Sequence, residues 1–218
     1  MASGLKPRSI VARARHPHGV AEGERIDYSR LVASHAVTSE TWDAFVRGAL
    51  VDRWLAEYDA ATPWETEVME IAQGELTFLF DGAPTLSAVG GDHGEDRVVA
   101  VWGRSAVPDH RRDRARLAGF IPNPLSWSAA QRDRGHFVAH AAGGGLDLNL
   151  FPQAASLNRG RTDEGRRWRR MERYAALHPG TPLFVRPSYD TQGWAPATLD
   201  YGLLTGDGLW LARFANRP

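Results

Sequence analysis

The feature that most constrains this chain is an ordered run of three patterns in its second half. Residues 135–140 and 146–151 both have the composition of short strands, and a glycine-rich loop separates them. Residues 163–177 predict a polar, arginine-rich helix, because Thr162 can cap its N-terminus and Pro179 can stop it. We therefore expect a strand–loop–strand–helix unit in this part of the fold.

The rest of the chain combines helical and strand patterns. Residues 40–59 place apolar side chains on one helical face, and the capping sequence TPWE predicts a helix over 62–73. A basic stretch at 108–120 predicts a short helix, residues 1–35 show no regular pattern, and DG at 81–82 is typical of a hairpin turn. Strands are expected at 75–80, 84–89, 97–103, 181–187, 197–204 and 209–214. Together these patterns predict an α+β fold with an antiparallel sheet.

Charge is distributed unevenly along a chain whose formal net charge is zero. Residues 1–103 carry 9 basic and 16 acidic side chains, whereas residues 104–218 carry 17 and 10. Such a split indicates that the second half faces a polyanion. We predict two regions: residues 1–100, a helix-and-strand region of unknown role, and residues 101–218, a catalytic domain. The oligomeric state is not predictable from these patterns.

The composition also excludes several kinds of site and location. The chain has no cysteine, so disulfides, thiol nucleophiles and cysteine-ligated zinc are excluded. No apolar run is long enough to span a membrane, and the basic N-terminus lacks the apolar segment of a secretory signal. We expect no membrane partner, and a protein that is cytoplasmic or delivered by a route that needs no signal peptide.

The residues along the strand–strand–helix unit match the needs of phosphodiester hydrolysis. That reaction needs a base to activate water, a cation to stabilise negative charge, and donors that hold the phosphate. His136 can act as the base, an asparagine carbonyl such as that of Asn158 can bind a hard cation, and arginines bind phosphate bidentately. Residues 131–173 contain nine arginines, which favours a nucleic-acid substrate.

Three ordered motifs make the segment resemble a known nuclease family. DRGH at 133–136, NLFPQAASLNRG at 149–160 and WRRMER at 168–173 are similar to the sugar-non-specific DNA/RNA endonucleases of the ββα-metal, or His-Me finger, class. The resemblance covers about 85 residues and leaves residues 1–100 without a match. It implies a ββα-metal core within the α+β fold, and one Mg²⁺ or Mn²⁺ ion coordinated mostly by water.

The resemblance also implies a role for each matching residue. His136 matches the general base, Asn158 the protein ligand of the metal, and Glu172 a carboxylate that holds metal-bound waters. Arg134 matches an arginine that contacts the phosphate, and Asn149 matches a structural asparagine that holds the loop between strand and helix. We expect three further arginines to bind the substrate backbone: Arg159, Arg169 and Arg173.

The spacing of the motifs departs from the family pattern. Asn158 and Glu172 are 14 positions apart, about 21 Å along a continuous helix, which is too far for one metal shell. Either the inserted RTDEGR loops out of the helix, or Glu164 replaces Glu172. Thr162 and Gly165 interrupt the start of the helix and favour the first explanation.

These features predict a metal-dependent endonuclease that acts on DNA and RNA with little sequence preference. A second hypothesis is a catalytically impaired nuclease fold that binds nucleic acid or a protein partner, and the unusual spacing of Asn158 and Glu172 is its main support. Because such a nuclease endangers the cell that makes it, we also expect restraint, for example by an inhibitor or immunity protein if the chain is a toxin or defence effector.

Overall fold

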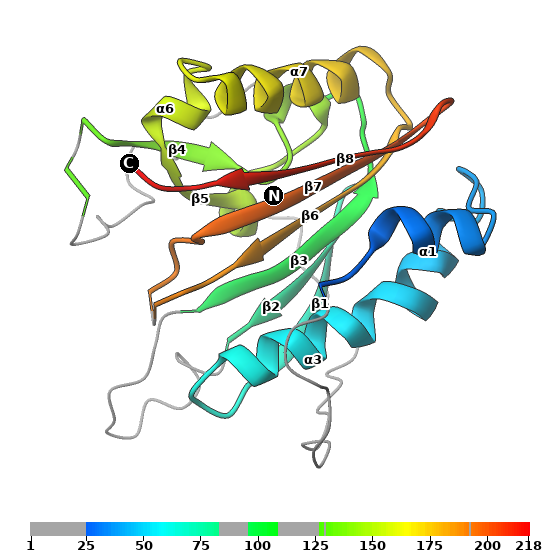
Figure 1. The fold of residues 1–218 in the computed structure, drawn as a ribbon, viewed down its shortest axis with the longest axis horizontal. Helices are drawn as coiled ribbons and strands as arrows, with labels where there is room; N and C mark the ends of the chain where they lie inside the picture. Colours follow the sequence, from blue (N-terminus) through cyan, green and yellow to red (C-terminus); the bar gives the residue numbers. More distant parts are fainter. Residues whose placement is uncertain (1–24, 83–95, 109–126, 129, 192) are drawn as a thin grey trace, which may run out of the picture.

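A six-stranded antiparallel sheet forms the centre of the protein (Figure 1). The computed structural model describes residues 25–82, 96–108, 127–128, 130–191 and 193–218. The strands follow the order β1-β2-β3-β6-β7-β8, and every neighbouring pair is antiparallel. Their bounds are Val68–Gln73 (β1), Leu76–Asp81 (β2), Arg97–Arg104 (β3), Pro182–Ser188 (β6), Thr198–Thr205 (β7) and Gly208–Ala215 (β8). The α+β fold with an antiparallel sheet, predicted from the sequence, is confirmed.

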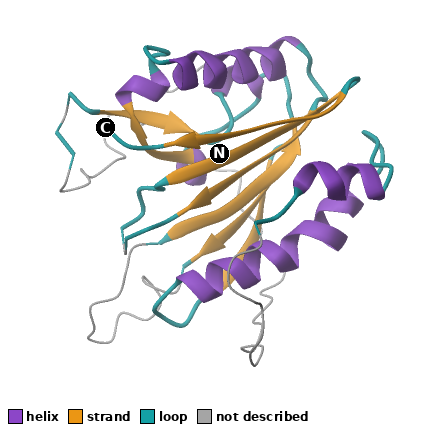
Figure 2. Cartoon of the chain, in the orientation of Figure 1, coloured by secondary structure: helices purple, strands orange, loops and turns teal. Residues whose placement is uncertain are grey.

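One face of the sheet is covered by what we call the helical layer (Figure 2). It consists of α1 (Tyr28–Ser34), α2 (Trp42–Phe45), the π-helical segment η1 (Val46–Leu50) and α3 (Val51–Ala61). Its core is aromatic: the Trp54 ring lies 6.3 Å from Trp102 and 5.6 Å from Phe184, centroid to centroid. Gly202 makes room for this core, because a Cβ there would lie 2.3 Å from the Phe184 ring.

The opposite face is covered by the hairpin layer, which contains the predicted strand–strand–helix unit. Strands β4 (Arg132–His136) and β5 (Leu150–Ala154) form a separate two-stranded sheet. The connection between them includes 3₁₀ turns η2 (His140–Ala142) and η3 (Asp147–Asn149), and β5 leads into α6 (Ala155–Asn158) and α7 (Asp163–Leu177). Helix α7 buries Gly165, Trp168, Met171 and Ala175 towards the sheet.

Trp168 anchors α7 to the central sheet. Its ring centroid lies 5.3 Å from that of Tyr201 on β7 and 5.0 Å from that of Phe214 on β8. The Thr162 side chain accepts a hydrogen bond from the Gly165 amide and caps the helix, as the sequence predicts. The predicted helix over 163–177 therefore forms with the expected bounds.

Several local predictions are wrong. The strands expected at 135–140 and 146–151 form instead at Arg132–His136 and Leu150–Ala154, because residues 140–142 and 147–149 form 3₁₀ turns in the connection between them. The helix expected over 62–73 is absent, because Thr62 follows the last residue of α3 and residues 68–73 form β1, which pairs along its whole length with β2. Pairing with a neighbouring strand outweighs the local helix-start signal. Residues 28–34, expected to be irregular, form α1, which Asp27 caps by accepting from the Arg30 amide.

The central sheet crosses the predicted boundary between residues 100 and 101. Strand β3 contains both residues and pairs with β2 on one side and β6 on the other. The turn between β1 and β2 is at Gly74, at φ 60°. The DG at 81–82 lies at the end of β2, and the segment that would complete its hairpin lies outside the described residues. Three predictions fall wholly or mainly outside the described residues: the irregular segment before residue 25, the strand at 84–89 and the helix at 108–120.

Candidate functional site

The DRGH motif forms most of strand β4, and its glycine is required by close packing. Gly135 pairs with Phe151 on β5. A Cβ on Gly135 would lie 2.5 Å from the Cβ of Gln153, closer than real side chains approach. The two strands can therefore pair in this register only with glycine at position 135.

Asp133 connects the first strand to the end of α6. The Asn158 Nδ2 donates a hydrogen bond to the Asp133 carboxylate at 2.9 Å. The Arg159 guanidinium donates to both carboxylate oxygens, at 2.9 and 2.6 Å. The first and second motifs of the sequence thus meet in one hydrogen-bonded group, which we call the Asp133 group: Asp133, Asn158 and Arg159.

The ionised state of Asp133 determines how the Asn158 amide is oriented. Partial burial by itself raises the pKa of Asp133, but hydrogen bonds from Arg159 and Asn158 and the positive charges of Arg159 and Arg161 outweigh it, so the pKa is lowered. An ionised carboxylate only accepts hydrogen bonds, so it must face the NH₂ of Asn158. The Asn158 Oδ1 then points away from Asp133, and it has no hydrogen-bond partner among the described residues.

Arg134 and His136 lie on the face of β4 opposite to Asp133, because side chains alternate along a strand. Arg134 is exposed, whereas His136 keeps 6% of its surface accessible and is placed across from Leu150. The structure therefore places the expected base and the expected phosphate ligand side by side on one strand. The Asp133 group lies on the side of the same strand that faces α6.

Asn149 is fully buried and holds the connection between β4 and β5. Its Oδ1 accepts from the Val138 amide at 2.9 Å, and its Nδ2 donates to the Val138 carbonyl at 2.8 Å and the Gly145 carbonyl at 3.0 Å. The loop that it closes joins the two strands, rather than a strand and the helix. The last backbone bond between the strands runs from the Phe137 amide to the Asn149 carbonyl, and the Asn149 side chain continues the pairing at Val138.

Glu172 and Glu164, the two alternatives for the metal shell, have different surroundings. Asn158 ends α6, and α7 begins only at Asp163, so the 14 positions to Glu172 do not lie on one continuous helix. Glu172 lies close enough to Tyr201 on β7 for its charge to raise the pKa of that tyrosine, after burial itself. Glu164 accepts from the Ala215 amide at 3.0 Å and so ties α7 to the end of β8.

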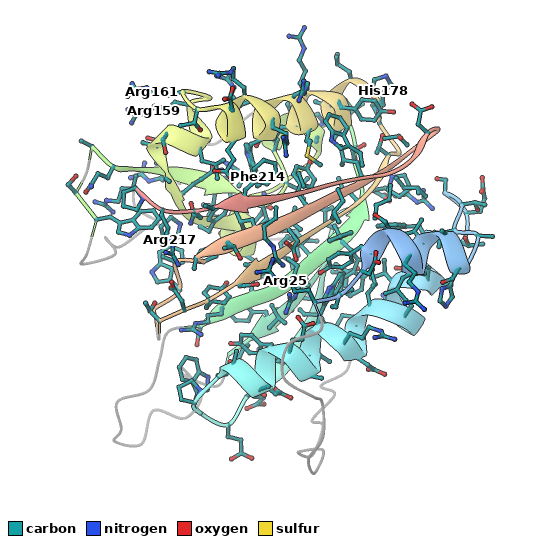
Figure 3. All side chains as sticks on the ribbon, in the orientation of Figure 1. Arg25, Arg159, Arg161, His178, Phe214 and Arg217 are labelled. Atoms are coloured by element: carbon teal, nitrogen blue, oxygen red, sulfur yellow. The ribbon has the colours of Figure 1, made fainter. Side chains whose placement is uncertain are left out.

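The three arginines expected to bind substrate are exposed but differently engaged. Arg159 is part of the Asp133 group, and Arg169 reaches the Arg159 carbonyl at 3.5 Å. Arg173 lies one turn beyond Arg169 and has no hydrogen-bond or ion-pair partner among the described residues. Figure 3 shows Arg159 and Arg161 together at the α6 end of α7.

Two buried polar residues belong to the surroundings of the site but were not singled out from the sequence. Gln153 pairs with Asp133 across the hairpin, is fully buried, and neither atom of its amide has a hydrogen-bond partner within the described chain. Asn216 donates to the Pro152 carbonyl and accepts from the Ala154 amide, which holds β5 in place. Gln153 lies inside a motif, whereas no local pattern marks Asn216.

Comparison of the chain with models of known protein families gives no match, and comparison with curated proteins gives none either. Within the described parts of the chain, no three or more His, Asp or Glu side chains form a group that could bind a metal. No helix in those parts has the length and apolar character needed to cross a membrane.

Proposed function

We propose that this protein is a metal-dependent endonuclease that hydrolyses phosphodiester bonds in DNA and RNA with little sequence preference. The observation that carries the proposal is the Asp133 group, in which a carboxylate and an arginine fix an asparagine amide whose carbonyl oxygen stays without a partner among the described residues. The group lies on the strand–strand–helix unit, whose first strand also carries His136, on the face opposite to Asp133.

The donor set fits a hydrated divalent ion. Mg²⁺ keeps several waters and needs few protein oxygens, so the Asn158 Oδ1 could hold it without a cluster of carboxylates. When bound, such an ion stabilises negative charge on the phosphate and on the leaving oxygen. Mn²⁺ offers the same oxygen chemistry. Glu172 is the proposed holder of bound waters, and Glu164 is the weaker candidate because the end of β8 engages it.

The protein's own side chains supply the general base, the phosphate contact and the orientation of the metal ligand. His136 takes a proton from a water molecule that attacks phosphorus in line with the leaving 3′ oxygen, so the products carry 5′-phosphates. Arg134, exposed on the same face of β4, donates to the phosphate. Asp133 orients the Asn158 amide and stays ionised because Arg159 and Asn158 lower its pKa.

The test is cleavage of supercoiled plasmid DNA and of an RNA transcript in the presence of Mg²⁺. We expect His136→Ala to reduce the rate by about 10²–10⁴-fold, the usual contribution of a general base. His35→Ala is the matched control, because His35 is an exposed histidine next to α1 in the opposite layer. Equal rates for the wild type and His136→Ala would contradict the proposal, as would cleavage that survives EDTA.

The role of the Asp133 group is tested separately through the metal. We expect Asp133→Ala to raise the Mg²⁺ concentration for half-maximal activity by about 10–100-fold, as is usual when a group that orients a metal ligand is removed. Asp43→Ala removes an arginine-paired carboxylate in the helical layer and should leave that concentration unchanged. An unchanged Mg²⁺ requirement in Asp133→Ala would contradict the proposal that Asp133 orients Asn158 as a metal ligand.

A second candidate function is supported by the near-complete burial of His136 and by the proximity of Glu172 to Tyr201. Both observations fit a nuclease fold that binds nucleic acid without cutting it. Tight binding of DNA by the wild-type protein, with no cleavage in Mg²⁺ or Mn²⁺, would favour this function over the first.

A further inference from the structure

One side of α7 carries a regular stripe of residues that leads away from the candidate site. Arg166, Arg170, Tyr174 and His178 follow one another at intervals of four, so they form one ridge on the helix surface. The ridge is about 18 Å long, from the rise per residue of an α-helix. Figure 3 shows Arg159 and Arg161 at the α6 end of α7 and His178 at its other end.

Helix α7 has more basic than acidic side chains, with five arginines against Asp163, Glu164 and Glu172. Arg166 pairs with Asp163 in the first turn. Arg167, Arg169, Arg170 and Arg173 are exposed and have no carboxylate partner in the part of the chain that the structure describes. Arginine side chains that no acidic group neutralises favour a polyanionic ligand.

The far end of the ridge is aromatic. The Tyr174 and His178 rings stack with centroids 4.2 Å apart, and the Trp210 ring on β8 meets Tyr174 edge-on at 5.9 Å. The Arg170 guanidinium lies 6.0 Å from the centroid of the Trp210 ring. Tyr174 and Trp210 are partly buried, and His178 is exposed.

A hollow of about 640 Å³ opens beside these rings. Tyr174 and His178 are among its lining residues, together with Thr38, Thr181 and Thr205. The hollow thus joins an aromatic surface to small polar groups, at the end of a row of arginines. Arginines that track a phosphate backbone and exposed rings on which bases stack are the two elements of single-strand binding.

We propose that Arg170, Tyr174, His178 and Trp210 form a second nucleic-acid contact, which binds an unpaired stretch of the strand whose phosphodiester lies at His136. Arg170 and Arg173 contact phosphates, and a base stacks on the Tyr174–His178 pair beside the hollow. The choice of ligand rests on the proposed function. The contact extends the bound length of substrate beyond the candidate site and raises affinity for single strands without taking part in bond cleavage.

The test measures binding by fluorescence anisotropy in a His136→Ala background, with a 24-residue oligothymidylate and a 24-base-pair duplex as probes. We expect the double variant Arg170→Gln/His178→Ala to bind the oligothymidylate about tenfold more weakly, within the range of about 5–150-fold that one stacked base contributes. The loss on the duplex should be smaller, because its bases are not free to stack. Tyr174→Phe keeps the ring and should bind like the parent.

Arg53→Gln/His35→Ala is the matched control, because it removes the same residue types from exposed positions in the opposite layer. Unchanged oligothymidylate binding in the α7 double variant, an equal loss in the control, or an equal loss on the duplex would each overturn the proposal. Hydrolysis of bis(p-nitrophenyl) phosphate in the otherwise wild-type chain should be unaffected by the α7 variant. If the wild type fails to hydrolyse this small diester while the binding differences hold, the proposed catalysis fails and the second contact stands.

Discussion

The two layers that cover the central sheet treat their charged side chains differently. In the helical layer, ion pairs join elements to the sheet: Arg47 pairs with Asp43 and with Glu70 on β1, and Glu57 on α3 pairs with Arg186 on β6. Arg30 and Arg53 of the same layer have no ion-pair partner within the described ranges. In the hairpin layer, most arginines on α7 have no acidic partner among the described residues. Ion pairs therefore connect the helical layer to the sheet, whereas the arginines of α7 remain mostly exposed.

The comparison extends to the cores below the layers. The helical layer buries Trp42, Trp54 and Trp102 in an aromatic core that contains no residue of the candidate site. The hairpin layer shares its core with the sheet through Trp168 and Met171, and the same layer contains the Asp133 group. The core of the helical layer is thus separate from the candidate site, whereas the hairpin layer contains both part of the other core and the candidate site.

The largest expected effect is alkaline unfolding, in which both layers behave alike. Burial raises the pKa of Tyr28, Tyr58 and Tyr201, and nearby Asp200, Asp81 and Glu172, respectively, raise it further. A raised pKa in the folded state means that this stabilisation is complete below pH about 10 and is lost above it. Each tyrosine removes about 1.4 kcal/mol per pH unit over that range.

The measurement is tyrosine absorbance and circular dichroism, recorded together from pH 9 to 13. At least three tyrosines should ionise only as the fold is lost. Full ionisation of all tyrosines while circular dichroism remains native would contradict the burial of these rings.

The second-largest expected effect is the loss of stability when a buried tryptophan is removed from either layer. Trp54→Ala and Trp168→Ala each create a large cavity and should lower the free energy of unfolding by about 3–5 kcal/mol. At a temperature where both variants are folded, Trp54→Ala should keep wild-type DNA cleavage, whereas Trp168→Ala should lose much of it because α7 shifts on the sheet. Urea unfolding and plasmid cleavage provide the two readouts. Equal loss of activity in the two variants would show that the two cores do not differ in their effect on DNA cleavage.

Two glycine-to-alanine substitutions, one in each layer, test the same difference by adding a single methyl group. A Cβ on Gly165 would lie 2.7 Å from the Ser156 carbonyl oxygen and 2.8 Å from that of Leu157, so Gly165→Ala forces α7 away from α6. We expect a loss of about 1–3 kcal/mol. Gly48 in the helical layer has nothing within 4 Å of such a Cβ, and Gly48→Ala should stabilise by about 0.5–1 kcal/mol. Thermal unfolding of the two variants should therefore move in opposite directions.

The smallest effect sharpens the contrast in charge. Arg47→Ala breaks partly exposed ion pairs and should cost at most about 1 kcal/mol of stability, with no change in DNA binding. Arg173→Ala should leave the unfolding transition unchanged and lower the salt dependence of DNA binding by about one phosphate contact. Binding titrations at several salt concentrations, beside urea unfolding, check both expectations. The reverse assignment of effects would show that Arg173 is structural.

The strand–strand–helix unit was predictable because its signals are local. The cap at Thr162 and the apolar positions of α7 act within a few residues, and the structure agrees with them. The order of the two strands is also as predicted, but each strand is displaced from its predicted range by three to four residues. The helix expected over 62–73 failed for the opposite reason. Its capping sequence was outweighed by pairing between β1 and β2, which depends on a neighbouring strand rather than on residues 62–65.

The sequence by itself determined the fold class, the order of the hairpin and helix α7, and which residues are candidates for the chemistry. Only the tertiary structure decided that Asp133 and Arg159 orient Asn158, because these contacts span about 25 positions. It also decided that α6 and α7 are separate helices and that one sheet crosses residue 100. Residue type and local periodicity can be read from the sequence alone. Which distant side chains come together depends on how the layers pack.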